Sequence, residues 1–366
     1  MNGIVGTVAV MSGITGFLAF LLTLALRTVG DYGMVEISIN EKKKIEVRGG
    51  DNLLSALSSE KIFIPSACGG KGTCGYCKVK VLHGGGAVLP MEEGLVAGDE
   101  IDEGVRLACQ VKLKEAISIE IPEDLFNVKE YSALVRKIED ITPKIKHLVL
   151  EIVEGGEIDF KPGQYVQLVA PPYEESDESV QRAYSIASSP ADKDFIELII
   201  GYVEGGVCTT YVHKYLKEGD RVSFNGPFGN FFYKDNDREM IMVAAGTGMA
   251  PILSILRAMR NSGIKRRCSF FFGAKTKEDL FFLDKMQNFK ESLFDFEFVP
   301  ALSRIGPDDD WEGARGRVTE PLIKHMESPE NKEAYLCGSP VMIDSIVKLL
   351  IEKGMDEELI YYDKFQ

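Results

Sequence analysis

The stretch CGGKGTCGYC, residues 68–77, places three cysteines and four glycines in one short loop. The 366 residues contain seven cysteines in all, too few and too unevenly spaced for the disulfide framework of a small secreted protein. Crowded thiols instead favour a metal centre, and glycines let the backbone approach it closely. The sequence therefore predicts a metal site built around this loop.

The cysteine spacing favours an iron-sulfur cluster. The expected ligands are Cys68, Cys74 and Cys77 in a C-x5-C-x2-C pattern, and Cys109, which follows Cys77 after 31 intervening residues. Structural zinc usually takes two C-x2-C pairs on separate knuckles. Three thiolates on one glycine-rich loop favour a [2Fe-2S] cluster, whose negative charge backbone N–H groups stabilise. Zinc and a metal-free reactive-thiol site are the alternatives.

The surrounding residues predict a small α+β domain over 33–122. Alternating residues at 35–40 and 43–50 favour a hairpin, and helical spacing favours a helix over 52–61 with Asp51 as its N-cap. The loop resembles ferredoxins of the plant and vertebrate type, with a first gap of five residues where the plant type has four. This resemblance implies a β-grasp fold.

The N-terminus differs in character from the rest of the chain. Residues 3–26 carry no charge, and a helix of this length spans a hydrocarbon core of ~30 Å. A transmembrane anchor over 1–30 is expected, with a signal peptide or a buried core helix as alternatives. Arg27 and Lys42–Lys44 follow the span, so the positive-inside rule places the catalytic domains on the cytoplasmic side of the cell membrane, behind a single pass.

Two further domains follow. Strand patterns separated by turn signals predict an antiparallel β-barrel over 128–232, and alternating strands and helices predict a Rossmann-like α/β domain over 236–366. The net charge of −14, without a basic stripe interleaved with aromatic residues, excludes nucleic acid as a partner.

The barrel region carries a candidate flavin motif, RAYSIAS at 182–188. Arg182 offers a fixed cation, Tyr184 a flat ring and Ser185 a hydroxyl; an ordinary strand with an exposed arginine is the alternative. With GGVCTTYV at 205–212 and GPFG at 226–229, the region resembles the FAD domain of the ferredoxin-NADP reductase superfamily. The resemblance implies FAD binding by Arg182, Tyr184, Ser185, Gly206 and Thr209.

The last domain carries a candidate nicotinamide site. In residues 241–259, Gly246 and Gly248 lie between a strand and a helix, where the backbone and the helix N-terminus favour a diphosphate. Residues 335–340, YLCGSP, are similar to the superfamily's C-G-x-P motif, which implies that Cys337 and Gly338 lie near the hydride-transfer site; a buried apolar cysteine is the alternative. The resemblance further implies that a C-terminal aromatic residue covers the flavin. Phe365 is the preferred candidate for this residue, and Tyr362 is the second choice.

The choice of nucleotide rests on the stretch GAKTKEDLFF, residues 273–282. Lys275, Lys277 and Arg304 offer cations for a 2′-phosphate, so NADPH is possible. The stretch itself is close to the pattern of relatives that use NADH, and NADH is the expected nucleotide.

The order of anchor, ferredoxin, FAD and NAD modules resembles the F subunit of the sodium-translocating NADH:quinone oxidoreductases. This implies electron transfer from NADH through FAD to the [2Fe-2S] cluster, and then to membrane-embedded redox subunits or another electron-acceptor protein. One alternative is a dedicated reductase for an oxygenase, a corrinoid protein or another redox carrier. The other is a redox sensor without sustained turnover.

Overall fold

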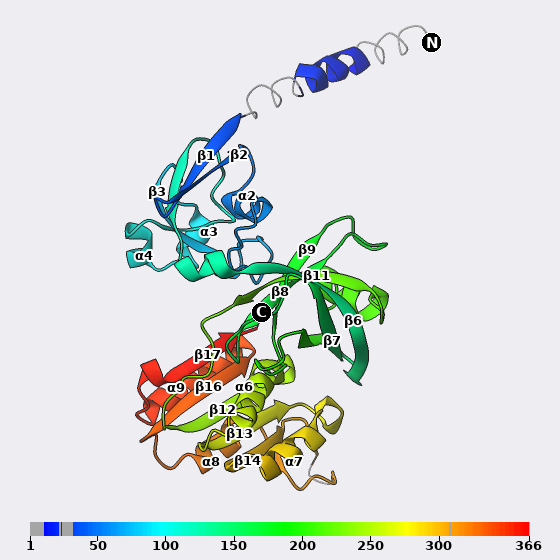
Figure 1. The fold of residues 1–366 in the computed structure, drawn as a ribbon, viewed down its shortest axis with the longest axis vertical. Coiled ribbons are helices and arrows are strands. Elements are labelled where there is room, and N and C mark those ends of the chain that lie inside the picture. Colours follow the sequence, from blue (N-terminus) through cyan, green and yellow to red (C-terminus); the bar gives the residue numbers. More distant parts are fainter. Residues whose placement is uncertain (1–10, 22, 24–31, 307–308, 366) are drawn as a thin grey trace. The chain divides into compact units, whose positions relative to one another are not determined.

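The computed structural model describes residues 11–21, 23, 32–306 and 309–365. The chain divides into two compact units, Met1–Asn127 and Val128–Gln366, which are considered separately (Figure 1). Residues 11–21 are helical. Across the described ranges, no helix is both long and apolar enough to cross a membrane. Within the expected span of 3–26, residues 3–10, 22 and 24–26 lie outside the described residues.

The first unit is the α+β domain that the sequence predicts. The expected hairpin is present: β1 (Met34–Ile39) pairs antiparallel with β2 (Lys43–Arg48). The sheet order is β2-β1-β5-β3-β4, with β1 and β5 parallel. Its remaining elements are α2 (Leu53–Ser59), β3 (Lys78–His83), α3 (Pro90–Glu93), α4 (Gly98–Asp102), β4 (Val105–Leu107), β5 (Ile117–Glu120) and η1 (Glu123–Asn127).

One detail of the expected helix is wrong. Asn52, and not Asp51, is the N-cap of α2, since its side-chain oxygen accepts the N–H of Ser55 at 2.9 Å. Leu53 and Leu57 of this helix are fully buried against the apolar face of β1. The first turn thus starts one residue later than predicted, because Leu53 must face the core.

The second unit begins with six antiparallel strands in the order β10-β7-β6-β11-β8-β9. They are β6 (Lys129–Thr142), β7 (Ile145–Glu154), β8 (Tyr165–Ala170), β9 (Val180–Ser185), β10 (Phe195–Gly201) and β11 (Arg221–Phe228), with α5 (Val207–Thr210) and η2 (Tyr211–Tyr215) between the last two. A bridge between Ile186 and Leu198 joins the two end strands. The sheet therefore closes on itself, as the strand pattern predicts.

A parallel sheet completes this unit, in the order β15-β14-β13-β12-β16-β17. Its strands are β12 (Glu239–Ala245), β13 (Arg267–Ala274), β14 (Asp295–Leu302), β15 (Ala314–Arg315), β16 (Lys332–Gly338) and β17 (Ile360–Lys364). Its helices are η3 (Gly246–Gly248), α6 (Met249–Asn261), η4 (Lys277–Asp279), α7 (Leu283–Ser292), α8 (Thr319–His325), α9 (Pro340–Glu352) and η5 (Glu357–Leu359).

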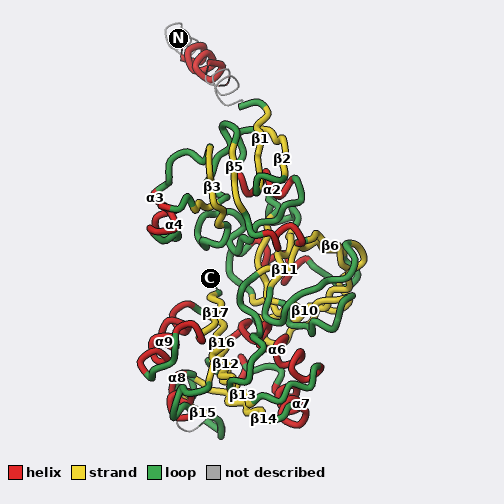
Figure 2. Tube along the Cα trace, turned by 60° about the vertical axis from the view of Figure 1, so that its left-hand side comes forward, coloured by secondary structure: helices red, strands yellow, loops and turns green. Residues whose placement is uncertain are grey.

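Helices cover both faces of the parallel sheet (Figure 2). Along β12, Met240 and Met242 pack with α6 and α7, whereas Ile241 and Val243 pack with α8 and α9. Because both faces are buried, β12 is a continuous apolar run and not an alternating one. This is the doubly wound arrangement that the sequence predicts for the nucleotide domain.

A buried charge network joins the barrel to α6. The two ring nitrogens of His147 lie 2.7 Å from Glu197 and 3.0 Å from Glu139. Arg257 of α6 lies 2.8 Å from the other oxygen of Glu197 and donates to the carbonyl of Ala187 at 2.9 Å. Burial opposes ionisation of Glu197, but His147 and Arg257 outweigh it and lower the pKa of its carboxyl to about 2.

Replacing Glu197 is therefore expected to destabilise the second unit in a pH-dependent way. Its ionised carboxylate contributes about 3 kcal/mol to the free energy of unfolding. This contribution is fully present above the ordinary pKa of a glutamate and is lost as the pH falls toward 2. Glu197→Gln should lower the free energy of unfolding at pH 7 by about this amount, with a difference that shrinks below pH 4.5. Urea unfolding of the full chain across this pH range measures it.

Glu139→Gln is the matched control. It removes the half-exposed partner of the same histidine and should cost less than about 1 kcal/mol. An equal gap between wild type and Glu197→Gln at pH 3 and pH 7 would contradict the assigned role of the carboxylate.

Candidate functional site

The four predicted cluster cysteines come together in the first unit. Cys68, Cys74 and Cys77 lie on the loop between α2 and β3, and Cys109 follows β4. The sulfurs of Cys68 and Cys74 are 3.3 Å apart, and the thiols of Cys77 and Cys109 are hydrogen-bonded. The loop is fixed from within, since the N–H of Gly70 donates to the hydroxyl of Ser66 at 2.9 Å.

The sulfurs form two pairs. No three histidine, cysteine or acidic side chains converge on a single ion in the part of the chain that the structure describes. Hydrogen bonding within each pair lowers the pKa of one thiol, that of Cys68 or Cys109, and raises the pKa of its partner, Cys74 or Cys77. Two sulfurs this close ionise together only beside a cation. The donor set thus fits a two-iron cluster, in which each iron takes two thiolates.

A buried ion pair that the sequence reasoning missed supports Cys109. Arg106 of β4 pairs with Glu92 at 2.7 Å, and both side chains are almost fully buried. Glu92 also accepts the N–H of Leu107 at 3.0 Å. The guanidinium donates to three carbonyls of the preceding loop, those of Gly85, Gly86 and Ala87. The strand that precedes Cys109 is therefore tied to the loop beside it.

The residues of the flavin motif lie on β9. Arg182 and Tyr184 share one face of this strand, since side chains alternate. The guanidinium donates to the neighbouring carbonyl of Gln181 at 2.7 Å, which leaves other N–H groups for a ligand. Burial raises the pKa of Tyr184, whose hydroxyl is hydrogen-bonded to Cys208. Ser185 is buried as well.

The second flavin segment is a tight turn into α5. The hydroxyl of Thr209 donates to the carbonyls of Val203 and Gly206 at 3.1 and 3.2 Å. A Cβ on Gly206 would lie 2.7 Å from this hydroxyl oxygen. Both predicted residues therefore shape the turn itself, in addition to any contact with a diphosphate.

The predicted nicotinamide residues meet where β12 and β16 end. A Cβ on Gly248 would lie 2.4 Å from the carbonyl oxygen of Cys337, so a glycine is required for close packing there. The Cys337 side chain is fully buried, and burial raises its pKa. Gly338 accepts the N–H of Phe365 at 2.8 Å, and Phe365 is partly buried against the same core. The structure thus brings Gly248, Cys337, Gly338 and Phe365 together.

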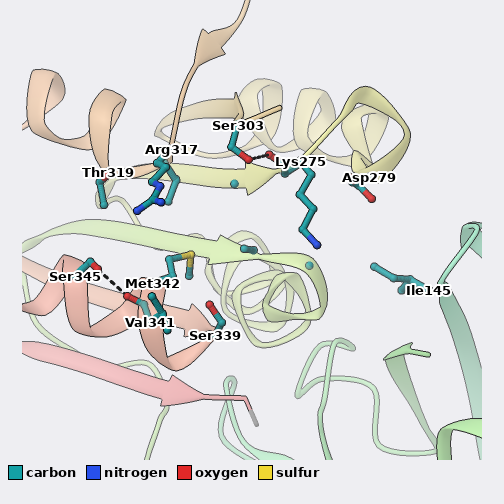
Figure 3. A pocket seen from close by; sticks show the side chains of 15 residues that line it. Ile145, Lys275, Asp279, Ser303, Arg317, Thr319, Ser339, Val341, Met342 and Ser345 are labelled. Atoms are coloured by element: carbon teal, nitrogen blue, oxygen red, sulfur yellow. Dashed lines mark hydrogen bonds between the residues drawn. The ribbon is translucent and has the colours of Figure 1, made fainter. Parts of the chain in front are cut away.

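A cavity of ≈ 440 Å³ lies at the carboxyl ends of the parallel strands (Figure 3). The strand order reverses between β12 and β16, which is where open α/β sheets bind nucleotides. Gly246 and Ser339 line it, and Figure 3 shows Lys275 and Arg317 on one side of the cavity and Met342 and Ser339 on the other. The cavity thus offers two cations to an anionic ligand.

The cationic side chains that line the cavity differ from the three that the sequence suggests for a 2′-phosphate. Lys275 lines the cavity, but the ammonium of Lys277 bonds to the carbonyl of Asp310, and Arg304 is not among the lining residues. Arg317 does line it and was missed, because it lies in no motif. The available signal was a basic residue two positions after the end of β15, at the carboxyl edge of the sheet.

Comparisons with known proteins agree with this division of the chain. Three family models match: "2Fe-2S iron-sulfur cluster binding domain" over residues 37–114, "Oxidoreductase FAD-binding domain" over 132–233 and "Oxidoreductase NAD-binding domain" over 242–348. They confirm the expected cofactors, a [2Fe-2S] cluster, FAD and NADH.

Solved structures share the architecture. A cytochrome P450 reductase from Amycolatopsis is 28% identical with a TM-score of 0.73, covering 90% of this chain and 98% of its own. The ferredoxin reductase of a carbazole 1,9a-dioxygenase is 24% identical with a TM-score of 0.70, over 91% and 99%. At 24% identity, the similarity to the carbazole 1,9a-dioxygenase ferredoxin reductase shows a shared fold only.

Similarity over nearly the full length identifies the family. The F subunit of the Na(+)-translocating NADH-quinone reductase of Neisseria meningitidis is 36% identical, covering 95% of this chain and 96% of its own. That of Actinobacillus succinogenes is 37% identical over 96% and 98%. The resemblance inferred from the motifs is thus confirmed, and the chain belongs to the family of Na(+)-translocating NADH-quinone reductase F subunits.

Proposed function

We propose that this chain takes electrons from NADH and passes them to a membrane-embedded redox partner within a sodium-translocating NADH:quinone reductase. The full-length match to F subunits, with four cysteine sulfurs arranged as two pairs, carries the proposal. FAD, when bound, accepts a two-electron hydride and releases electrons singly, and the [2Fe-2S] cluster accepts one at a time.

The protein holds and orients these groups. Cys68, Cys74, Cys77 and Cys109 are the proposed cluster ligands. Arg182 and Thr209, with Gly206, bind the flavin diphosphate, while Tyr184 and Ser185 contact the ring. Gly246 and Gly248 bind the nucleotide diphosphate, and Lys275 and Arg317 add positive charge beside it. Cys337, Gly338 and Phe365 frame the hydride-transfer face, where Phe365 covers the flavin ring and excludes water.

Stopped-flow absorbance tests this function. The anaerobic full chain is mixed with NADH and, separately, with NADPH, and flavin bleaching and cluster reduction are followed. Faster bleaching with NADH, followed by cluster reduction, is the expected result. If neither NADH nor NADPH reduced the flavin, the proposal would be overturned and the redox sensor favoured.

The likeness to the Amycolatopsis cytochrome P450 reductase supports a second candidate, a dedicated reductase for a separate oxygenase. The two candidates differ in the acceptor. Reduction of quinone by NADH, when the chain is added to membranes that hold the other subunits, favours the first. Electron transfer to a soluble oxygenase component, without quinone reduction, favours the second.

Removal of one proposed ligand separates the two halves of the electron route. Cys77→Ala should abolish electron delivery to one-electron acceptors through the cluster while NADH still bleaches the flavin. Cys268→Ala is the matched control, because this buried thiol lies on β13 of the nucleotide domain and is not a proposed cluster ligand. Iron content and flavin absorbance report both results. A normal cluster in Cys77→Ala would contradict the ligand assignment.

Arg317 is expected to determine the affinity for the nucleotide. Loss of a charge-assisted hydrogen bond in Arg317→Ala should raise the KM for NADH roughly tenfold to hundredfold and change kcat little. Arg304→Ala is the control and should leave the KM within about twofold. Steady-state kinetics with ferricyanide measures both, and equal effects of the two variants would refute the placement of the nucleotide.

The N-terminal segment is proposed to anchor the chain in the cell membrane by a single pass, with the redox domains on the cytoplasmic side. Met11, Phe17 and Phe20 are exposed on the helix of residues 11–21, as lipid contact requires. The hydroxyls of Thr15 and Thr23 donate to backbone carbonyls one turn earlier, so they carry no unpaired donor into lipid.

Deletion of residues 1–30 should release the chain from membranes and leave NADH-ferricyanide activity unchanged. Fractionation after a carbonate wash, which strips peripheral proteins, measures the distribution. Retention of the deleted chain in the washed pellet would argue against this anchor. Protease accessibility of the full chain in sealed vesicles tests the orientation.

A further inference from the structure

Gln110 directs a hydrogen-bond donor at one of the proposed cluster ligands. It follows Cys109 in the chain, and its Nε2 lies 3.2 Å from the Cys109 sulfur. A neutral amide keeps its N–H protons throughout the physiological pH range. This donor is therefore permanent.

The loop backbone leaves room for this amide. Gly72 has φ +73°, and a Cβ there would lie 2.5 Å from Nε2 and 3.1 Å from Cδ of Gln110. Any larger residue would displace the amide. The side chain of Gln110 is thus held between the Cys109 sulfur and the bare backbone at Gly72.

We propose that Gln110 is a positioning residue that raises the reduction potential of the cluster through its hydrogen bond to the Cys109 sulfur. The inference rests on the proposed function, in which Cys109 is a cluster ligand. Reduction adds one electron, supplied by NADH through the flavin, and no proton. The added negative charge on the sulfur strengthens the bond from the N–H, so this donor stabilises the reduced cluster more than the oxidised one.

The direct test is Gln110→Met, which keeps the length of the side chain and removes the donor. A redox titration of the full chain, followed by electron paramagnetic resonance, should show a lower midpoint potential. A tenfold change in the reduction equilibrium corresponds to 59 mV for one electron. Gln287→Met is the control, since this amide bonds to Glu291 on α7 and its loss should leave the potential unchanged.

A measurement on the wild-type chain decides the matter even if Gln110→Met assembles no cluster. Gln110 is the single glutamine in residues 1–127. With glutamine labelled by ¹⁵N in the side-chain amide, pulsed electron paramagnetic resonance of the reduced cluster should detect a ¹⁵N coupling. Absence of this coupling would overturn the inference.

The outcomes separate the inference from the function beneath it. An unchanged potential in Gln110→Met with an intact cluster overturns the role of Gln110 alone. A normal cluster in Cys109→Ala, or no cluster in the wild type, overturns the ligand assignment itself.

Discussion

Gly248 lies so close to the carbonyl of Cys337 that no side chain fits between them, and the arrangement of the second unit depends on this contact. It sets the depth at which η3 packs against β16, and therefore where α6 begins. From that point α6 runs back to the barrel, where Ser254 and Asn261 bond to the backbone of Ser188 and the hydroxyl of Ser189. Ser188 is the last residue of the flavin motif, and Ser189 follows it directly. One close backbone contact thus relates the nucleotide loop to the flavin strand.

The first unit solves a different problem, the confinement of four sulfurs near one another. Thiolates repel, and thiols share protons, so the loop needs support that does not come from the sulfurs. The Arg106–Glu92 pair supplies it on the side of Cys109. Such a pair is costly to bury, and its value here lies in satisfying the loop carbonyls and fixing one conformation.

Prediction from the sequence worked where the signal is local. The hairpin at β1 and β2, the doubly wound order and the grouping of the cysteines follow from alternation, periodicity and spacing. The features that the sequence did not predict depend on contacts between distant segments. Arg317 lines the cavity because β15 ends beside it, and Glu92 pairs with Arg106 across fourteen positions of chain. The cap of α2 shifted from Asp51 to Asn52 because the core position of Leu53 decided the first turn.

The residues through which α6 bonds to the barrel must also lie on the same side of the helix. Ser254, Arg257 and Asn261 stand three and four positions apart, so they share one face of a helix of 13 residues, about 20 Å long. One inserted residue would rotate everything beyond it by about 100° and turn Arg257 away from Glu197. The length of α6 is therefore constrained as tightly as its composition, and divergence within this family is expected to change its residues while preserving their number.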